Sequence, residues 1–396
     1  MSFKFARRLR SVQYSATIGL SDTVKKMRLQ KREAVNLAAA RPDFDTPAHI
    51  KEATIDALRQ PKEYTVYTES RGLLELRQAV ASKLARENSV NVDPEREILI
   101  TVGAREGLFL AMQSLVNPGD EVLVMDPSWL TYQAQVRLAS GNPVFVPLFE
   151  RDHYHLDPDV LRSRVTDRTK AIIVNTPNNP TGAVSTLEEL KAIRDIAVEH
   201  DLVVVTDEIY EYFVYDGHKH IAPASLPGMQ ERTLTINACS KAWAMTGWRV
   251  GYVAGPADLI EKLLLVHQHL VSAPCSFAQK GAVTAFQEGR SSVDLMVESY
   301  RRRRDRIAKH LSDHQRVEFI VPEGACFFFP SFPDIDLSSE ELTGIFLEQG
   351  GLALTPGSAF GEQGCGRLRF SFAGLSEDQI EEVMFGFKQV VDGLMA

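Results

Sequence analysis

Residues 169–210 decide the fold: TKAIIVNTP (169–177), then TLEELKAIRDIAVEH (186–200), then DLVVVTDEIY (201–210). The first and third runs are continuously apolar at their centres, and the middle run places apolar residues at the spacing of an amphipathic helix. Two such strands joined by a helix are typical of parallel strands buried on both faces of a sheet. The stretch therefore predicts a parallel β-sheet covered by helices.

The same alternation extends over the middle of the chain, whereas the last third differs. EVLVMDP (121–127), RTLTINACS (232–240) and WRVGYVAGP (248–256) predict further strands of the sheet. After about residue 290 the apolar runs are short, which favours a smaller α+β domain. Its predicted strands are VEFIVP (317–322), ACFFFPSF (325–332), GLALTPG (351–357) and RLRFSFAG (367–374), with helices at 338–349 and 376–394. The predicted fold class is α/β, with a large and a small domain.

Charge and composition argue against several classes of protein. The 396-residue chain has a net charge of −8, so it lacks the basic footprint of a nucleic-acid-binding protein. The basic run Arg301–Arg304 lies in a helical pattern and predicts a solvated helix face. No apolar run is long enough to predict a membrane span, and residues 1–20 predict an N-terminal arm rather than a secretory signal. The four scattered cysteines lack metal-ligand spacing, so we expect no metal site, and we expect reduced thiols in a cytoplasmic protein.

Polar residues follow the predicted strands at one edge of the sheet. Asn179 lies in the turn after AIIVN, Asp207 and Tyr210 follow LVVVT, and Ser240 and Lys241 follow TLTIN. Taken singly, each has an ordinary explanation, such as turn chemistry, a helix cap or core packing. Ligands bind beyond the carboxyl ends of parallel strands, so the joint occurrence favours a binding site.

The run SKAWAMTGWR (240–249) places Lys241 and Arg249 in an apolar stretch with no neighbouring acid. A lysine in an apolar pocket can form a Schiff base with a carbonyl, and a buried arginine needs a carboxylate or phosphate. A helix opening at AREG (104–107) could bind phosphate, and a carboxylate could keep a pyridine nitrogen protonated. These are the partners that pyridoxal 5′-phosphate requires.

Eight stretches carry a resemblance to a known family: PDFDTPAHI (42–50), YTESRGLLELRQAV (67–80), NPGDEVLVMDPSWLTY (117–132), NTPNNPTGAV (175–184), TDEIYEYFVYDG (206–217), SKAWAMTGWRVGY (240–252), PEGACFFFP (322–330) and PGSAFGEQGCGRLRFSFAG (356–374). In this order the chain resembles the class I/II aminotransferases, pyridoxal-phosphate enzymes of fold type I. It is most similar to the bacterial-type aspartate aminotransferases. The resemblance places residues 46–289 in the large cofactor-binding domain, and residues 1–45 with 290–396 in the small one.

The resemblance implies a role for each residue that contacts the cofactor. Lys241 matches the lysine that binds the cofactor covalently and then moves the proton, and Arg249 matches the phosphate-binding arginine. Asp207 matches the partner of the ring nitrogen. Tyr210 and Asn179 match residues that hydrogen-bond the ring oxygen.

Further contacts complete the implied cofactor site. Trp129 matches the aromatic residue that stacks on the ring, and Ala104 and Arg105 lie in the loop whose amides meet the phosphate. Ser240, beside Lys241, is also expected at the cofactor. Tyr67 matches a tyrosine that reaches the phosphate of the neighbouring subunit, which implies a homodimer with composite active sites.

The substrate residues implied by the resemblance include two departures from the family. Arg369 matches the arginine that binds the substrate α-carboxylate. Ser15, Thr17 and Arg105 match the positions that receive a distal carboxylate, where the family has lysine instead of arginine. Ala40 replaces a glycine whose backbone lies near the substrate carboxylate. Asn179 and Trp129 are expected to contact the substrate as well.

The implied activity is transfer of an amino group between an L-amino acid, aspartate or glutamate, and a 2-oxo acid. One alternative keeps pyridoxal phosphate and changes the reaction to β-elimination or cyclisation, because a fold does not determine its chemistry. A second alternative is a non-catalytic regulator that binds the cofactor.

Overall fold

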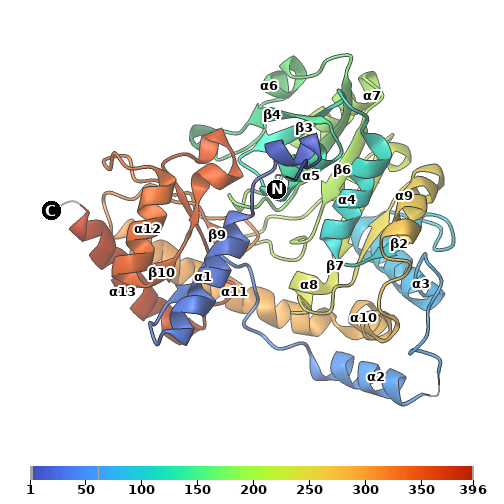
Figure 1. The fold of residues 1–396 in the computed structure, drawn as a ribbon, viewed down its shortest axis with the longest axis horizontal. Helices are drawn as coiled ribbons and strands as arrows, with labels where there is room; N and C mark the ends of the chain where they lie inside the picture. Colours follow the sequence, from blue (N-terminus) through green and yellow to red (C-terminus); the bar gives the residue numbers. More distant parts are fainter. Residues whose placement is uncertain (1–2, 61, 395–396) are drawn as a thin grey trace.

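A computed structural model describes residues 3–60 and 62–394. At its centre lies a seven-stranded sheet with the strand order β2-β8-β7-β6-β5-β3-β4 (Figure 1). Strand β8 runs antiparallel to both of its neighbours, and the other pairings are parallel. The strands are β2 Ile98–Thr101, β3 Glu121–Asp126, β4 Asn142–Pro147, β5 Thr169–Asn175, β6 Val203–Asp207, β7 Thr233–Ala238 and β8 Gly251–Ala254. The predicted α/β fold with a mostly parallel sheet is confirmed.

Both faces of this sheet are buried, which explains the continuously apolar strands. On β5, Ile172 packs in one apolar cluster with residues of α6 and α7, and Ile173 packs in another with residues of α4, α5 and α9. The predicted helix 186–200 is α7, which begins after a capping box formed by Thr186 and Glu189. The helices of this part are α2 Ala48–Arg59, α3 Leu74–Lys83, α4 Ala104–Leu115, α5 Thr131–Leu138, α6 Pro158–Ser163, α7 Leu187–Glu199, α8 Cys239–Ala242, α9 Ala257–Leu270 and α10 Ser276–Glu288.

The last third of the chain forms a second layered unit together with N-terminal residues. Strand β1 (Val35–Asn36) pairs in parallel with β10 (Leu352–Ala353), and β11 (Thr355–Pro356), β12 (Leu368–Ser371) and β9 (Phe327–Phe328) form an antiparallel sheet. The helices here are α1 Ala16–Leu29, α11 Arg290–Ser312, α12 Ser339–Gly350 and α13 Glu377–Gly393. A phenylalanine-rich cluster fills this unit and also takes in Tyr210 and Phe213. The division at residues 45 and 290 stays a prediction.

Two predictions about this unit are wrong. The stretch 317–322 forms no strand; only Glu318 pairs, in an isolated bridge with Ser331. The run Arg301–Arg304 lies on α11 as predicted, but two of its side chains are buried rather than solvated. Arg303 pairs with Asp43 at 2.8 Å, and Arg304 pairs with Asp216 at 2.7 Å. Burial of these cations follows from acids supplied by distant segments.

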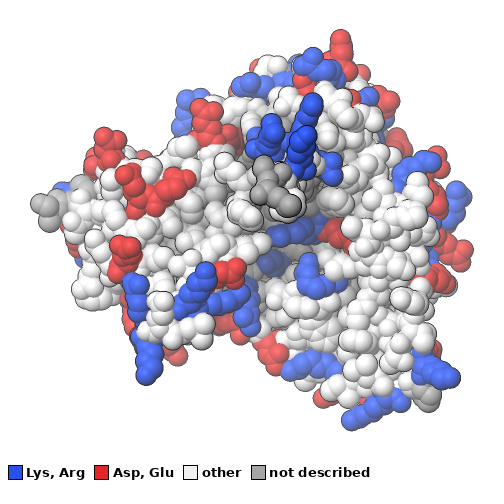
Figure 2. Space-filling view, in the orientation of Figure 1, with Lys and Arg blue, Asp and Glu red and all other residues white. Residues whose placement is uncertain are grey.

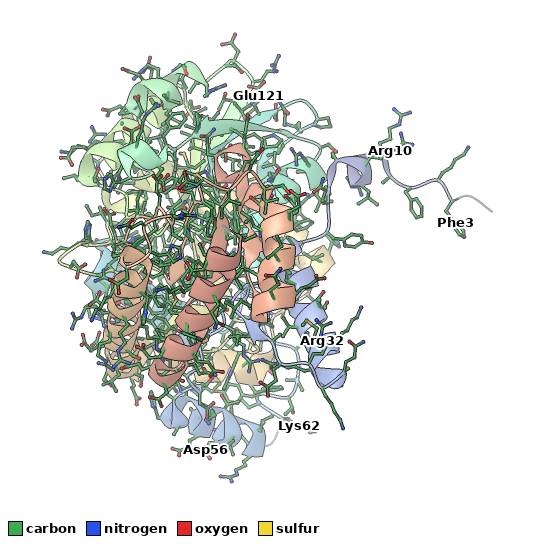
Figure 3. The ribbon with its side chains drawn as sticks, turned by 90° about the vertical axis from the view of Figure 1, so that its left-hand side faces the viewer. Phe3, Arg10, Arg32, Asp56, Lys62 and Glu121 are labelled. Atoms are coloured by element: carbon green, nitrogen blue, oxygen red, sulfur yellow. The ribbon has the colours of Figure 1, made fainter. Side chains whose placement is uncertain are left out.

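The first described residues form an arm that extends away from the body of the molecule (Figure 3). The arm carries exposed Phe3, Phe5 and Tyr14 beside the short helix η1. Among the described residues no helix combines the length and the apolar character that a bilayer crossing requires. The short helices are η1 Arg7–Ser11, η2 Leu84–Asn88, η3 Glu150–Asp152, η4 Pro223–Ser225, η5 Gln230–Arg232, η6 Gly357–Phe360 and η7 Glu362–Gly364.

Candidate active site

A cavity of about 670 Å³ opens at the carboxyl ends of β5, β6 and β7 and is bordered by α1. Figure 2 shows the hollow with Lys and Arg side chains inside it. Most of the predicted site residues line this cavity together: Thr17, Ala40, Ala104, Arg105, Trp129, Asn179, Asp207, Tyr210, Ser240, Lys241, Arg249 and Arg369. The sheet edge therefore brings together residues that lie up to hundreds of positions apart in the chain.

Lys241 lies on α8, the single helical turn that follows β7. Its Nζ donates a hydrogen bond of 2.5 Å to the carbonyl oxygen of Ala40. Burial lowers the pKa of Lys241 to about 8, and the charges of Arg369 and Arg249 act in the same direction. Near neutral pH an appreciable share of this lysine is therefore the neutral amine, which can act as a nucleophile or base.

Asp207 ends β6 and is held by two neighbours. Tyr132 donates its phenolic proton to Oδ2 of Asp207 at 2.9 Å, and Asn175 donates to the Asp207 carbonyl oxygen at 2.8 Å. Burial raises the pKa of Asp207 to about 6. Burial also raises the pKa of Tyr210 well above its ordinary value, so this phenol keeps its proton and can donate it.

An anion cradle forms where α4 begins. Gly103, with φ +75°, precedes the helix, and a Cβ added there would lie 2.4 Å from Nη2 of Arg249. Arg249 itself has φ +58°, and its Nη2 donates to the Val102 carbonyl oxygen at 3.1 Å. No side chain caps α4. Its first N–H groups and the guanidinium of Arg249 therefore converge on one position suited to a phosphate.

Arg369, on β12, is the most deeply buried of the pocket cations. Its Nη1 donates to Oδ1 of Asn179 at 2.9 Å, and its Nη2 donates to the Ala38 carbonyl oxygen. The guanidinium lies against the rings of Phe327 and Phe360 at 4.6 and 4.8 Å. Its Nε is buried without a hydrogen-bond partner among the described residues. Burial lowers the pKa of the Arg369 guanidinium to about 10. A desolvated cation with a free donor is suited to bind a carboxylate.

Arg105 lies over the ring of Trp129, with 5.0 Å from Cζ to the ring centroid. Its pKa is lowered, first by burial and then by the charge of Arg249. In the described part of the chain no carboxylate lies within ion-pair distance of Arg105, Arg249, Arg369 or Lys241. The pocket thus holds four cations without anionic partners.

Two predicted residues lie outside the cavity of this chain. Ser15 hydrogen-bonds the Thr17 hydroxyl at 2.9 Å but does not line the cavity. Tyr67 is 90% exposed and also lies away from the lining. The expected role of Tyr67 at a second subunit stays a prediction.

Several residues that line the cavity were not predicted from the sequence. Tyr132 stands one helical turn after Trp129, and this spacing is the signal that could have suggested it. Asn175 is the last residue of the predicted strand run AIIVN, and no role was predicted for it. The remainder had no chemical signal in the sequence: Ile18, Ser21, Asp22 and Lys25 of α1, with Ala38, Ala39, Ile209 and Thr246.

The family model for aminotransferase class I and II matches residues 32–385. The chain belongs to the class I and II aminotransferase family. This aminotransferase is 42% identical to "Aromatic-amino-acid aminotransferase 2" of Thermococcus litoralis, over 90% of this chain and 91% of that protein. It is 41% identical to "Aspartate aminotransferase" of Pyrococcus abyssi, over 91% of this chain and 92% of the other.

Solved structures agree with these relatives. The structure of aspartate aminotransferase from Thermus thermophilus with maleate superposes with a TM-score of 0.93 at 37% identity, covering 98% of this chain and 100% of that one. The predicted family, fold and enzyme class are confirmed. The protein is a transaminase that moves an amino group between an amino acid and a 2-oxo acid.

Proposed function

We propose that this aminotransferase uses pyridoxal 5′-phosphate and acts on acidic amino acids, aspartate or glutamate, with a 2-oxo acid as acceptor. The observation that carries the proposal is a set of four cations around one cavity that also holds Asp207, none of which has a carboxylate partner within residues 3–60 and 62–394. The phosphate of the cofactor, the α-carboxylate of the substrate and a carboxylate on the substrate side chain would supply the missing negative charges.

The residues fit the proposed cofactor. The start of α4 and Arg249 would hold its phosphate, since this cradle has free donors and no side-chain cap. Asp207 would accept a hydrogen bond from the ring N–H, and Tyr210 and Asn179 would face the ring oxygen. Lys241 would bind the aldehyde carbon through its amine. When bound, the cofactor supplies an electron sink for the pair left at the substrate Cα after proton removal.

The chain's own groups would then carry out the proton transfer. Lys241, released when the substrate amine takes its place on the aldehyde carbon and with a pKa of about 8, would take the proton from the substrate Cα and deliver it to that former aldehyde carbon. Asp207, once ionised beside the ring nitrogen, would hold the proton of that ring nitrogen in place. Arg369 would bind the α-carboxylate through its two parallel N–H groups and so orient the Cα–H bond.

The proposal of an acidic substrate depends on Arg105. Its guanidinium lies over Trp129 beside Arg249 and has no anionic partner among the described residues. Burial and the charge of Arg249 lower its pKa, so a distal carboxylate would relieve an unfavourable charge. Thr17 lines the same cavity and can donate a further hydrogen bond. One relative of this chain is named for aspartate, another for aspartate and prephenate, and a third for aromatic amino acids. Ala40 also lines the cavity, and its methyl group would narrow the pocket where the resemblance implies a glycine.

We also propose a cytoplasmic homodimer with composite sites. Tyr67 presents an almost fully exposed ring, which is suited to reach a second copy. The exposed free thiols Cys275 and Cys365 are typical of a reducing compartment. Within each subunit, residues 1–45 with 290–396 would move as the small domain over residues 46–289 when substrate binds.

The absorption spectrum of the protein loaded with pyridoxal phosphate tests the reaction. L-aspartate or L-glutamate, added without any oxo acid, should convert the band of the lysine-bound cofactor to that of its amino form. Neutral amino acids of similar size serve as the control and should react more slowly. Release of pyruvate and ammonia with the cofactor band unchanged would instead establish elimination.

A further inference from the structure

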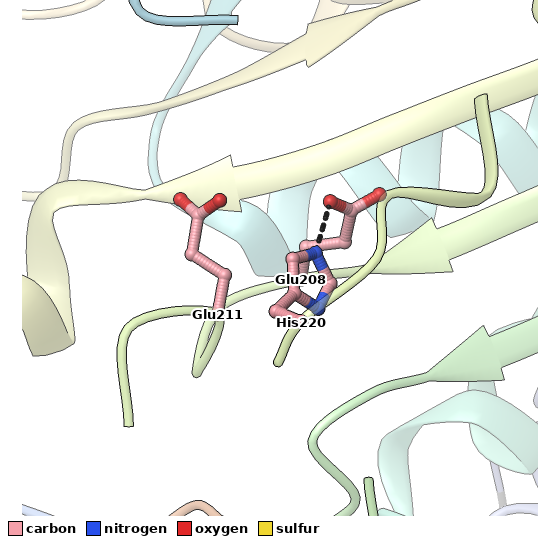
Figure 4. Close-up of side chains that lie close together, drawn as sticks. All are labelled: Glu208, Glu211 and His220. Atoms are coloured by element: carbon pink, nitrogen blue, oxygen red, sulfur yellow. Dashed lines mark hydrogen bonds and ion pairs between the residues drawn. The ribbon is translucent and has the colours of Figure 1, made fainter. Parts of the chain in front are cut away.

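A second cluster of charged side chains is buried behind the pocket, on the other side of the segment 207–211. Figure 4 shows three of its members, Glu208, Glu211 and His220. The side chains of Glu208 and Glu211 are 0% and 6% exposed, and that of Lys83, the last residue of α3, is 1% exposed. Nothing in the proposed reaction uses these residues.

The carboxylate of Glu211 is fully engaged. Lys83 donates to both of its oxygens, with 2.5 Å to Oε2, and Asn88 donates to Oε2 at 2.9 Å. Asn237 donates to Oε1 at 2.7 Å. A carboxylate with this many donors has one fixed orientation.

Glu208 is engaged as well, by the hydroxyl of Thr206 at 2.7 Å and by Nε2 of His220 at 2.8 Å. Burial raises the pKa of Glu208, but the hydrogen bond from His220 and the charge of Lys83 bring it below its ordinary value. The ligand atoms of Glu208, Glu211 and His220 lie within 4.8 Å of one another, a spacing that a metal ion could use. The Lys83 ammonium already supplies the positive charge, so we assign no metal here.

This cluster connects the two segments that carry the reacting groups. The segment 207–211 has side chains on both sides: Asp207 and Tyr210 line the pocket, whereas Glu208 and Glu211 join the cluster. Asn237, on β7, stands four residues before Lys241, and its Oδ1 accepts the backbone N–H of Ala238 at 2.7 Å. Glu211 therefore links the segment of Asp207 to the strand that leads into Lys241.

We infer that Lys83 is a positioning residue for the transamination: through Glu211 and Asn237 it holds the segment of Asp207 and the strand before Lys241 in one register. This inference rests on the roles of Asp207 and Lys241 proposed above. A buried ion pair adds little stability over an apolar pair of the same volume, so its effect here is on geometry. A misplacement on the order of 1 Å at the reacting groups can cost about 100-fold in rate.

The double variant Lys83→Met/Glu211→Gln tests this inference without leaving a buried unpaired charge. Its matched control is Arg77→Met/Glu69→Gln, which removes another ion pair of α3. Arg77 pairs with Glu69 at 2.6 Å and is 4% exposed. Its remaining bonds reach the carbonyl oxygens of residues 72 and 94, not the segments at the pocket.

Three readouts separate positioning from folding: the thermal midpoint, the circular dichroism of the bound cofactor in its visible band, and kcat and KM for the best amino donor. We expect the Lys83 double variant to lose about tenfold in kcat with KM within about twofold, and to lose cofactor dichroism. The control variant should match the wild-type protein in kcat and in cofactor dichroism. Equal kcat and dichroism in the two variants would overturn the inference.

A neutral variant covers the case in which the double variant does not fold. Asn237→Ala removes the link between Glu211 and β7, together with the side-chain bond to the Ala238 N–H, and leaves the Lys83–Glu211 pair in place. It should lower kcat and dichroism in the same direction, by a few-fold. Unchanged values would overturn the inference too. Wild-type protein that fails to bind pyridoxal phosphate through Lys241 would instead contradict the proposed function, independently of either variant.

Discussion

The two sides of the segment 207–211 bury charged groups in opposite ways. Behind the segment, Lys83 and Glu211 neutralise each other and every carboxylate oxygen of Glu211 has a donor. In front of it, the buried Arg369 and the half-buried Lys241 have no carboxylate partner among the described residues. The same kinds of residue thus form scaffold on one side and an anion site on the other.

The pKa values follow this difference. Burial lowers the pKa of Lys241 to about 8 and that of Arg369 to about 10, which shows that the pocket disfavours their charges until an anion arrives. Burial raises the pKa of Asp207 to about 6 for the same reason. A site that holds uncompensated charges in place is already arranged for its ligands, so these side chains need little reorganisation when an anion binds.

The largest effect is expected from Lys241→Ala. Without the amine, the pocket loses both its covalent anchor and its base, and turnover should fall by at least about 10⁴-fold. The measurement is the half-reaction with a saturating amino donor. Glu211→Gln is not a suitable control because it disturbs the scaffold, whereas Lys25→Met at the cavity rim should keep turnover near wild type.

The pH dependence of stability should differ between the wild-type protein and the Asp207→Asn variant. Because the carboxyl pKa rises from 3.8 to about 6 in the folded protein, the protonated form is favoured there. Asp207 therefore destabilises the cofactor-free protein as the pH rises from about 4 to above 6, by about 3 kcal/mol relative to Asp207→Asn. Urea unfolding of both proteins between pH 4 and 7 measures the difference, and parallel pH profiles would contradict it.

Arg369→Gln should weaken substrate binding next. The amide keeps a donor but loses the charge and the parallel pair of N–H groups, so we expect a loss of about 2 kcal/mol, or roughly 30-fold in kcat/KM. Arg367→Gln is the matched control on the same segment, because Arg367 is paired with Glu150 at 2.6 Å and does not line the cavity. Equal losses in both variants would show that Arg369 acts on folding alone.

Arg105→Gln should change specificity rather than overall rate. Losing one partly exposed charge at the distal end should lower kcat/KM for aspartate by about tenfold. The value for phenylalanine should change less than about threefold. A parallel loss for both donors would place Arg105 at the phosphate instead.

Much of the fold could be predicted because the amino-acid composition of a strand indicates whether one or both of its faces are buried. The runs 169–177 and 201–210 are apolar on both sides, and only a covered parallel sheet buries them. VEFIVP is also rich in strand-forming residues but forms only one bridge, because a strand also needs a partner whose position local sequence does not determine.

The site shows the same limit. Lys241 and Asp207 could be predicted because strand ends gather at one edge of the sheet. Tyr132 reaches Asp207 across 75 residues of sequence, and Lys83 reaches Glu211 across 128. Such contacts depend on how α3 and α5 pack. The spacing of Tyr132 after Trp129 could suggest that Tyr132 lies near the site, but it does not identify Asp207 as its partner.

One binding measurement tests the central claim, that the unpaired cations mark the positions of anions. Succinate and butyrate have the same carbon count and differ by one carboxylate, and neither carries an amino group to react. Calorimetric titration of the cofactor-loaded protein should show succinate binding at least about tenfold tighter, and Arg105→Gln should remove the difference. Equal affinities of wild-type protein for the two acids would contradict the account.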